Sequence, residues 1–182
     1  MAKRRALFLD RDGTINVDYG YVYKPEDFHF IDGIFELVAE STRLDYLNII
    51  VTNQSGIGRG YFSESDFHNL MLWVSNQFIH HDGKIHGIYF CPDHPEYGVG
   101  KYKRDSIMRK PSPGMILKAA EEHNISLDCS VLVGDSLRDI EAGKAAAIGC
   151  NLLFKERKSE EPSTCLTIQA VNSLNDVIAI LG

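Results

Sequence analysis

The sequence predicts an α/β protein built on a doubly wound parallel sheet. Short continuous apolar runs alternate along the chain with segments whose apolar residues recur every three or four positions. Several of these runs end in polar residues and glycine, and ligands of doubly wound sheets bind beyond the carboxyl ends of the strands. With 182 residues, 44% of them hydrophobic, the chain fits one domain with a well-buried core.

Five strands are expected, because a short apolar run is typical of a strand that is buried on both faces of a parallel sheet. They cover residues 6–9, 48–52, 86–90, 130–133 and 151–154. Helices are expected between them: one after Gly33, one through 67–78 capped by Ser63, one with Pro113 as its first residue, one over 136–147 and one over 173–181. The order therefore alternates strand and helix.

Two segments do not fit the alternation. Residues 92–111 carry scattered charges without a clear period, and a loop of that length inside a compact domain is usually functional or mobile. Residues 155–164 are charged and polar, which predicts a solvated surface loop. Neither segment has the composition of a linker, so we expect a single domain over residues 1–182, with the 92–111 loop on the substrate side.

The charge balance argues against several classes of partner. The 19 basic and 25 acidic residues give a formal net charge of −6, which disfavours general binding of nucleic acid or of an anionic membrane surface. No apolar run approaches the roughly 18 residues of a membrane span, and the run at 6–9 is too short for a signal peptide. We expect a cytoplasmic monomer. Its four cysteines, Cys91, Cys129, Cys150 and Cys165, are expected to be free thiols in or near the core.

Asp10 and Asp12 follow the first strand directly and are separated by one residue. If the chain turns there, the two carboxylates converge and repel each other in a partly buried cleft. A hard divalent ion such as Mg²⁺ relieves this repulsion, because it prefers oxygen ligands. Taken alone, the pair fits a metal site and two solvated loop aspartates equally well.

The wider context resembles the haloacid dehalogenase (HAD)-like phosphohydrolases. The run FLDRDGTI at 8–15 is similar to the first motif of that superfamily, and three further landmarks follow in order. They are Thr52 and Asn53 at a strand end, Lys110 before a helix, and Asp135 after the fourth strand. The resemblance implies a Rossmann-like core without a separate cap domain.

The resemblance also implies a role for each landmark residue. Asp10 would attack phosphorus and form an aspartyl-phosphate, while Asp12 would act first as general acid and then as general base. Thr52 would hydrogen-bond the phosphoryl group, and Lys110 would neutralise its charge. The cofactor Mg²⁺ would be held by Asp10, Asp135 and the backbone carbonyl of Asp12. Asp139 keeps two interpretations, as a helix cap for Ser136 or as a support of the metal site.

Two further stretches, at 12–22 and 52–60, are similar to the D-glycero-D-manno-heptose 1,7-bisphosphate 7-phosphatases and to the histidinol-phosphate phosphatases. The expected substrate is therefore a small phosphorylated sugar, the heptose bisphosphate, with histidinol phosphate as the alternative. A receiver-like module that accepts a phosphoryl group for signalling is an alternative of a different class. The expected substrate-binding residues are Asp18, Tyr19, Gly20, Tyr21, Asn53, Gln54, Ser55, Arg59 and Arg109. Arg59 and Arg109 suit a second phosphate because arginine binds phosphate in a bidentate manner.

One departure from these relatives concerns zinc. Many of them carry a zinc loop with Cys-x-His and a later Cys-x-Cys just before the Arg-Lys-Pro run. This chain has Cys91 and Asp93 at the first pair and no cysteine between 103 and 108. A closed structural zinc site needs four ligands, so we predict that zinc is absent.

Overall fold

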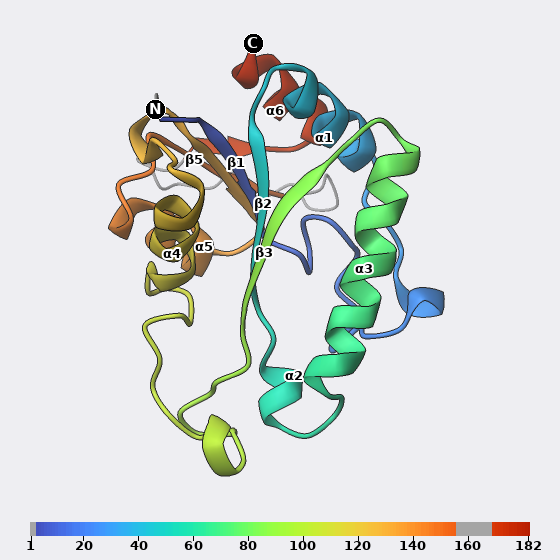
Figure 1. The fold of residues 1–182 in the computed structure, drawn as a ribbon, viewed down its shortest axis with the longest axis vertical. Coiled ribbons are helices and arrows are strands. Elements are labelled where there is room, and N and C mark those ends of the chain that lie inside the picture. The colour runs from blue at the N-terminus through green and yellow to red at the C-terminus, as the bar shows by residue number, and fades with distance from the viewer. Residues whose placement is uncertain (1–2, 156–168) are drawn as a thin grey trace.

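The computed structural model describes residues 3–155 and 169–182. Six strands form one sheet in the order β3-β2-β1-β4-β5-β6 (Figure 1), and every neighbouring pair is parallel. The strands are β1 (Ala6–Leu9), β2 (Leu47–Asn53), β3 (Ile85–Cys91), β4 (Val131–Gly134), β5 (Cys150–Phe154) and β6 (Gln169–Val171). The predicted fold class, a doubly wound parallel sheet, is confirmed.

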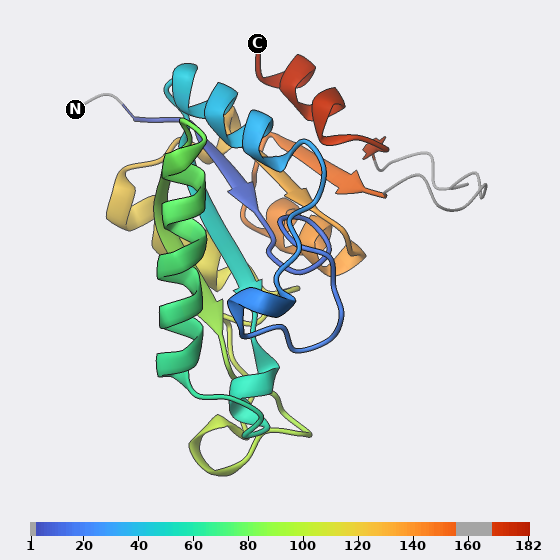
Figure 2. The ribbon, with the colours of Figure 1, turned by 90° about the vertical axis from the view of Figure 1, so that its right-hand side faces the viewer.

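Helices cover both faces of the sheet, as Figures 1 and 2 show. They are α1 (Ile34–Arg43), α2 (Ser55–Gly58), α3 (Glu64–His80), α4 (Gly114–His123), α5 (Leu137–Ala145) and α6 (Leu174–Leu181). The side chains of β1 point alternately into two hydrophobic cores, one on each face of the sheet. Leu7 and Leu9 pack with α1, α3 and α6, whereas Ala6 and Phe8 pack with α4 and α5. Because β1 is buried on both faces, it is apolar at every position.

The predicted elements agree with the structure to within one or two residues, with two additions. The strand β6 was not predicted, because two of its three residues are exposed and so short an edge strand carries little apolar signal. The single-turn helix α2 was not predicted either. Pro113 precedes α4 as its N-cap and is not its first residue, so that boundary was wrong by one position.

The N-terminus of α3 follows the predicted local chemistry. The Ser63 side chain accepts a hydrogen bond from the Asp66 backbone N–H at 3.1 Å, and Asp66 Oδ2 accepts one from the Ser63 N–H at 2.8 Å. This reciprocal pair satisfies two donors that the first turn of a helix leaves open.

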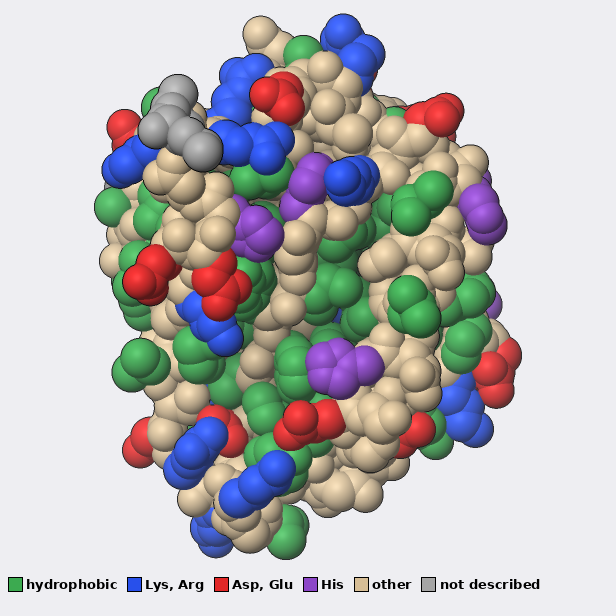
Figure 3. Space-filling model, in the orientation of Figure 1, with side chains coloured by type: hydrophobic (Ala, Val, Ile, Leu, Met, Phe, Trp, Pro, Cys, Tyr) green, Lys and Arg blue, Asp and Glu red, His purple; other side chains and the backbone are tan. Residues whose placement is uncertain are grey.

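The surface and the cysteines complete the comparison with the sequence. Figure 3 shows acidic and basic side chains interspersed over one face of the molecule. Cys91 is buried and Cys150 half-buried, but Cys129 is exposed, so the expected core position was wrong for Cys129; all three are free thiols. Cys165 and residues 156–164 of the expected surface loop lie outside the described residues. Among the described residues, no helix has the length and apolar character needed to cross a membrane.

The sheet order determines where a ligand site can form. β1 lies between β2 and β4, so the chain leaves β1 and β4 toward opposite sides of the sheet and opens a crevice at their carboxyl ends. The loop between β3 and α4 returns toward this edge. It contains a short 3₁₀ turn at Gly100–Tyr102 and contacts α2, where Val99 N–H donates to Gly58 O at 2.8 Å.

Candidate active site

A pocket of about 450 Å³ lies at the carboxyl edge of the sheet. Its walls come from the segments after β1, β2 and β4 and from the end of the 92–111 loop. The lining residues are Asp10, Asp12, Asp18, Gly20, Tyr21, Thr52, Asn53, Gln54, Ser55, Gly56, Arg109, Lys110, Asp135, Ser136, Arg138 and Asp139. The structure thus brings together residues that are more than 120 positions apart in the chain.

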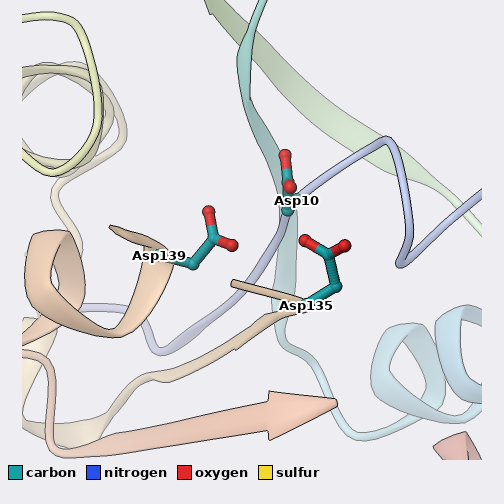
Figure 4. Close-up of side chains that lie close together, drawn as sticks. All are labelled: Asp10, Asp135 and Asp139. Carbon is teal, nitrogen blue, oxygen red and sulfur yellow. The ribbon is translucent and has the colours of Figure 1, made fainter. Parts of the chain in front are cut away.

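Three carboxylates meet in this pocket. Asp10, Asp135 and Asp139 each place one oxygen within 4.8 Å of the others, and Figure 4 shows these side chains turned toward one another from the ends of β1 and β4 and the start of α5. Burial raises the pKa of Asp10 to about 7, and burial together with the charge of Asp139 raises that of Asp135 to about 6. A hard divalent cation would offset both the burial and the repulsion, so the donor set fits Mg²⁺.

The ammonium group of Lys110 lies among these carboxylates. Its Nζ lies 2.7 Å from Asp10 Oδ1 and 2.6 Å from Asp139 Oδ1, and it donates to the Val51 carbonyl at 2.8 Å. Burial alone would lower the pKa of Lys110, but the two ion pairs outweigh burial and raise it. The ammonium group is therefore charged and held between the carboxylates.

Asn53 fixes the backbone of Lys110 through two hydrogen bonds. Its Nδ2 donates to the Lys110 carbonyl at 3.0 Å, and its Oδ1 accepts from the Lys110 N–H at 3.0 Å. A single amide side chain thus satisfies one donor and one acceptor of the loop. Asn53 was predicted to bind substrate; in the structure it lines the pocket and also anchors the loop that carries Lys110.

Asp12 is held by donors on both of its oxygens. Oδ1 accepts hydrogen bonds from Arg11 Nη2 and from Asn16 Nδ2, the latter at 3.1 Å. Oδ2 accepts one at 2.9 Å from Gln54 Nε2, which also contacts Thr52 Oγ1 at 2.9 Å. Because β2 lies beside β1, the residues after the two strands meet at this edge of the sheet.

Glycines allow the carboxylates to come this close. Gly13 has a φ of +82°, and a Cβ at this position would lie 2.1 Å from Asp135 Oδ2. Gly134 likewise leaves room for Asp139, because a Cβ added at Gly134 would lie 2.3 Å from the Asp139 Cβ. An alanine at either position would force the neighbouring aspartate to move.

Most of the residues predicted from the sequence line the pocket, but Tyr19 and Arg59 do not. The Tyr19 side chain is 63% exposed and its ring packs against His29. The Arg59 guanidinium lies over the ring of Tyr97 at 4.3 Å and 5.8 Å from that of Tyr21, so it supports a lining residue from behind.

Four lining residues were not among the predicted catalytic, substrate-binding or metal-binding residues: Gly56, Ser136, Arg138 and Asp139. The interpretation of Asp139 as a helix cap is confirmed, whereas support of the metal site stays a prediction. Its Oδ2 accepts hydrogen bonds from the Ser136 N–H at 3.0 Å and the Ser136 hydroxyl at 2.7 Å, which caps α5, while its Oδ1 pairs with Lys110. The sequence signal for Asp139 was its position three residues after a serine.

The residues at the expected zinc positions do not fit a zinc site. Asp93 occupies the position at which the expected zinc loop would have histidine, and its Oδ2 pairs with Arg104 Nε at 3.0 Å. Burial raises the pKa of the Cys91 thiol, so the neutral thiol is favoured in the metal-free protein. The Asp93 carbonyl instead accepts a hydrogen bond at 3.2 Å from Arg109 Nη1. The loop thus contacts Arg109, which lines the pocket, through the Asp93 carbonyl.

Comparisons with known proteins agree with this geometry. A family model described as HAD-hydrolase-like matches residues 107–165. A relative from Burkholderia mallei (strain ATCC 23344), named D-glycero-alpha-D-manno-heptose-1,7-bisphosphate 7-phosphatase, is 50% identical over 179 residues, which cover 98% of this chain and 94% of that protein. The chain belongs to the HAD-like hydrolase family.

Other members of the family give the same result. A relative from Vibrio cholerae, named D-glycero-beta-D-manno-heptose-1,7-bisphosphate 7-phosphatase, is 46% identical over 173 residues. The matched region covers 94% of this chain and 93% of that protein. A HAD-like phosphatase from Mesorhizobium loti superposes with a TM-score of 0.86 at 34% identity, over 98% of this chain and 86% of that one.

The D,D-heptose 1,7-bisphosphate phosphatase from B. bronchiseptica superposes with a TM-score of 0.80 at 27% identity, over 97% of each chain, and was crystallised with magnesium and phosphate. The resemblance inferred from the motifs is therefore confirmed, as is the enzyme class, a HAD-type phosphatase. The alternative of a receiver-like signalling module is excluded.

Proposed function

We propose that this HAD-type phosphatase removes the 7-phosphate of D-glycero-D-manno-heptose 1,7-bisphosphate, in the biosynthesis of nucleotide-activated heptose. The observation that carries the proposal is the 50% identity, over 98% of the chain, to a relative named for this reaction. A pocket of about 450 Å³ suits a sugar bisphosphate.

Asp10, Asp135 and the backbone carbonyl of Asp12 are proposed to hold Mg²⁺. The closeness of the Asp10 and Asp135 carboxylates, two members of the cluster described above, supports this assignment. When bound, Mg²⁺ neutralises charge on the transferring phosphoryl group and fixes its orientation relative to Asp10.

In the first step, an Asp10 carboxylate oxygen attacks phosphorus. The new bond forms an aspartyl-phosphate, the bond from phosphorus to the sugar oxygen breaks, and Asp12 gives its proton to the departing oxygen. Lys110, 2.7 Å from Asp10 Oδ1, offsets the negative charge that gathers around the phosphoryl group. Thr52 lines the same pocket, and its hydroxyl donates a hydrogen bond to a phosphoryl oxygen.

In the second step, Asp12 takes a proton from water, and the water oxygen attacks phosphorus. The bond between Asp10 and phosphorus breaks, which releases inorganic phosphate and restores both carboxylates. Asp12 lines the same pocket as Asp10, as both proton transfers require.

The remaining phosphate of the substrate is proposed to bind Arg109 and Arg138, which both line the pocket and whose charges interact. Arg59 contributes positive charge from behind Tyr21. Asp18, Gly20 and Tyr21 form the entrance beside Gln54 and Ser55, where polar groups suit sugar hydroxyls. Histidinol phosphate, the alternative substrate, carries one phosphate and a cationic amine, so it would leave these arginines without an anionic partner.

The experiment that tests the proposal measures phosphate release from a panel of substrates, with and without Mg²⁺. The panel contains both anomers of the heptose bisphosphate, because the relatives are named for different anomers, and histidinol phosphate. We expect the highest kcat/KM on one heptose anomer, dependence on Mg²⁺, and a loss of about 10³-fold or more in Asp10→Asn. A higher kcat/KM on histidinol phosphate would overturn the substrate assignment.

Zinc is proposed to play no part, which the contacts of Asp93 with Arg104 and Arg109 support. A monomeric state, a cytoplasmic location and independence from nucleic acid and membranes stay predictions from the sequence.

A further inference from the structure

Arg11 lies between the two motif aspartates, and its side chain has no exposed surface. Burying a guanidinium is costly unless its donors are paired. Here Nε and Nη1 have no hydrogen-bond partner among the described residues. An apolar side chain would fill this part of the core at lower cost, so the charge of Arg11 calls for a functional explanation.

The single paired nitrogen of Arg11 joins two parts of the site. Nη2 donates to Asp12 Oδ1 and to the Val22 carbonyl, the latter at 2.9 Å. The guanidinium carbon also lies 6.0 Å from the centre of the Phe28 ring. Asp12 lines the pocket and Arg11 does not, so Arg11 reaches the reacting atoms only through Asp12.

The other donors to Asp12 cannot replace this contact. Asn16 and Gln54 are neutral amides, at 3.1 and 2.9 Å, whereas hydrogen bonds between a guanidinium and a carboxylate are stronger. Val22, the second partner of Arg11, follows Asp18, Gly20 and Tyr21 in the chain, which line the pocket. One buried nitrogen therefore ties the proposed acid and base to the segment that carries these lining residues.

We propose that Arg11 is a positioning residue that holds the Asp12 carboxylate in the orientation for proton transfer to the leaving oxygen. The inference rests on the proposed function only in that Asp12 serves as acid and base in the hydrolysis of an alkyl phosphate. In that step the bond from phosphorus to the substrate oxygen breaks, and the proton of Asp12 moves to that oxygen.

The test compares two leaving groups, because only a poor leaving group needs the proton. The kcat/KM value covers the steps up to departure of the leaving group. A sugar alkoxide must be protonated, whereas p-nitrophenolate leaves without a proton. For Arg11→Met, which keeps the volume without the charge, we expect kcat/KM to fall about 100-fold on the sugar phosphate and little on p-nitrophenyl phosphate.

Two outcomes would overturn the inference: an equal loss on both substrates, or no loss on the sugar phosphate. Arg11→Lys keeps the charge and should restore part of the lost rate on the sugar phosphate only. It also serves as the second variant if Arg11→Met does not fold, which circular dichroism checks. In that case a loss in Arg11→Lys that is the same for both leaving groups overturns the inference.

Ser41→Ala is the matched control. Ser41 is also fully buried and donates to Val38 O and Asn48 Oδ1, outside the pocket lining. Loss of the Ser41 hydroxyl should lower stability, and any change in kcat/KM should be the same for both leaving groups. If the wild type prefers histidinol phosphate, the proposed substrate fails, but histidinol phosphate is also an alkyl phosphate and the Arg11 comparison then proceeds on it.

Discussion

Lys110 and Asp139 form an ion pair of 2.6 Å in which the two side chains are only 3% and 2% exposed. The second oxygen of Asp139 caps α5 through Ser136. One carboxylate thus fixes both the start of a helix and the ammonium group beside Asp10. Breaking a buried ion pair from one side leaves the other charge without compensation.

Asp139→Asn should lower kcat about 10- to 100-fold, because it removes the charge that holds Lys110 but keeps an oxygen for the cap. Steady-state kinetics and thermal unfolding measure the two effects separately. Asp66→Asn is the matched control, since Asp66 caps α3 through Ser63 with the same contacts at 2.8 and 2.7 Å. A similar loss of kcat in both variants would show that Asp139 acts only as a cap.

Asn53→Ala should weaken catalysis through Lys110. It removes both hydrogen bonds to the Lys110 backbone and should lower the free energy of unfolding by about 2 kcal/mol. We expect kcat to fall with it, measured by phosphate release. Asn151→Ala, which removes a bond to the Ile148 carbonyl at 2.9 Å outside the pocket lining, should lower stability but not kcat. An unchanged kcat in Asn53→Ala would contradict the anchoring role.

Gly13→Ala should impair Mg²⁺ binding, because a Cβ at Gly13 would lie 2.1 Å from Asp135 Oδ2. Isothermal titration with Mg²⁺ measures the effect. Gly60→Ala is the control: Gly60 has a similar φ of +80°, but no atom lies within 4 Å of its added Cβ. Both variants should lose about 1 kcal/mol of stability from backbone strain, and only Gly13→Ala should lose affinity for Mg²⁺. Equal Mg²⁺ affinities in the two variants would show that Gly13 does not shape the metal site.

Mg²⁺ should stabilise the protein more at high pH than at low pH. The pKa values of Asp10 and Asp135, about 7 and about 6, lie above the ordinary value of 3.8. Protonation therefore stabilises the metal-free fold at low pH, and this contribution is lost as the pH rises through about 6 to 7. Protons compete with the cation, so the shift in Tm on adding Mg²⁺ should be larger at about pH 8 than at about pH 5. A shift independent of pH would show that these carboxylates do not bind the metal.

Metal analysis of the purified protein should find well below one zinc per chain. After chelation and removal of the chelator, Mg²⁺ alone should restore full activity, because Asp93 in this loop pairs with Arg104 at 3.0 Å. One tightly bound zinc per chain would contradict this, as would a need for zinc to regain activity.

Local pattern was sufficient for the main strands and for the residues that follow them. Asp10 and Asp135 could be assigned from the sequence because the motifs around them resemble those of the HAD-like phosphohydrolases, and both follow predicted strands. The sequence did not indicate β6, whose three residues are mostly exposed. It also grouped Arg59 with the substrate residues, although its guanidinium packs on Tyr97 outside the pocket lining.

By itself, the sequence determined the alternation of strands and helices, the order of the four landmarks and the departure from the zinc loop. Only the tertiary structure decided that Asn53 holds Lys110, that Asp139 has two roles and that Arg11 is buried against Asp12. The physical reason is distance along the chain. Periodicity reports which face of an element is apolar, whereas a contact such as that between Asn53 and Lys110, 57 residues apart, exists only after the strands have packed in their final order.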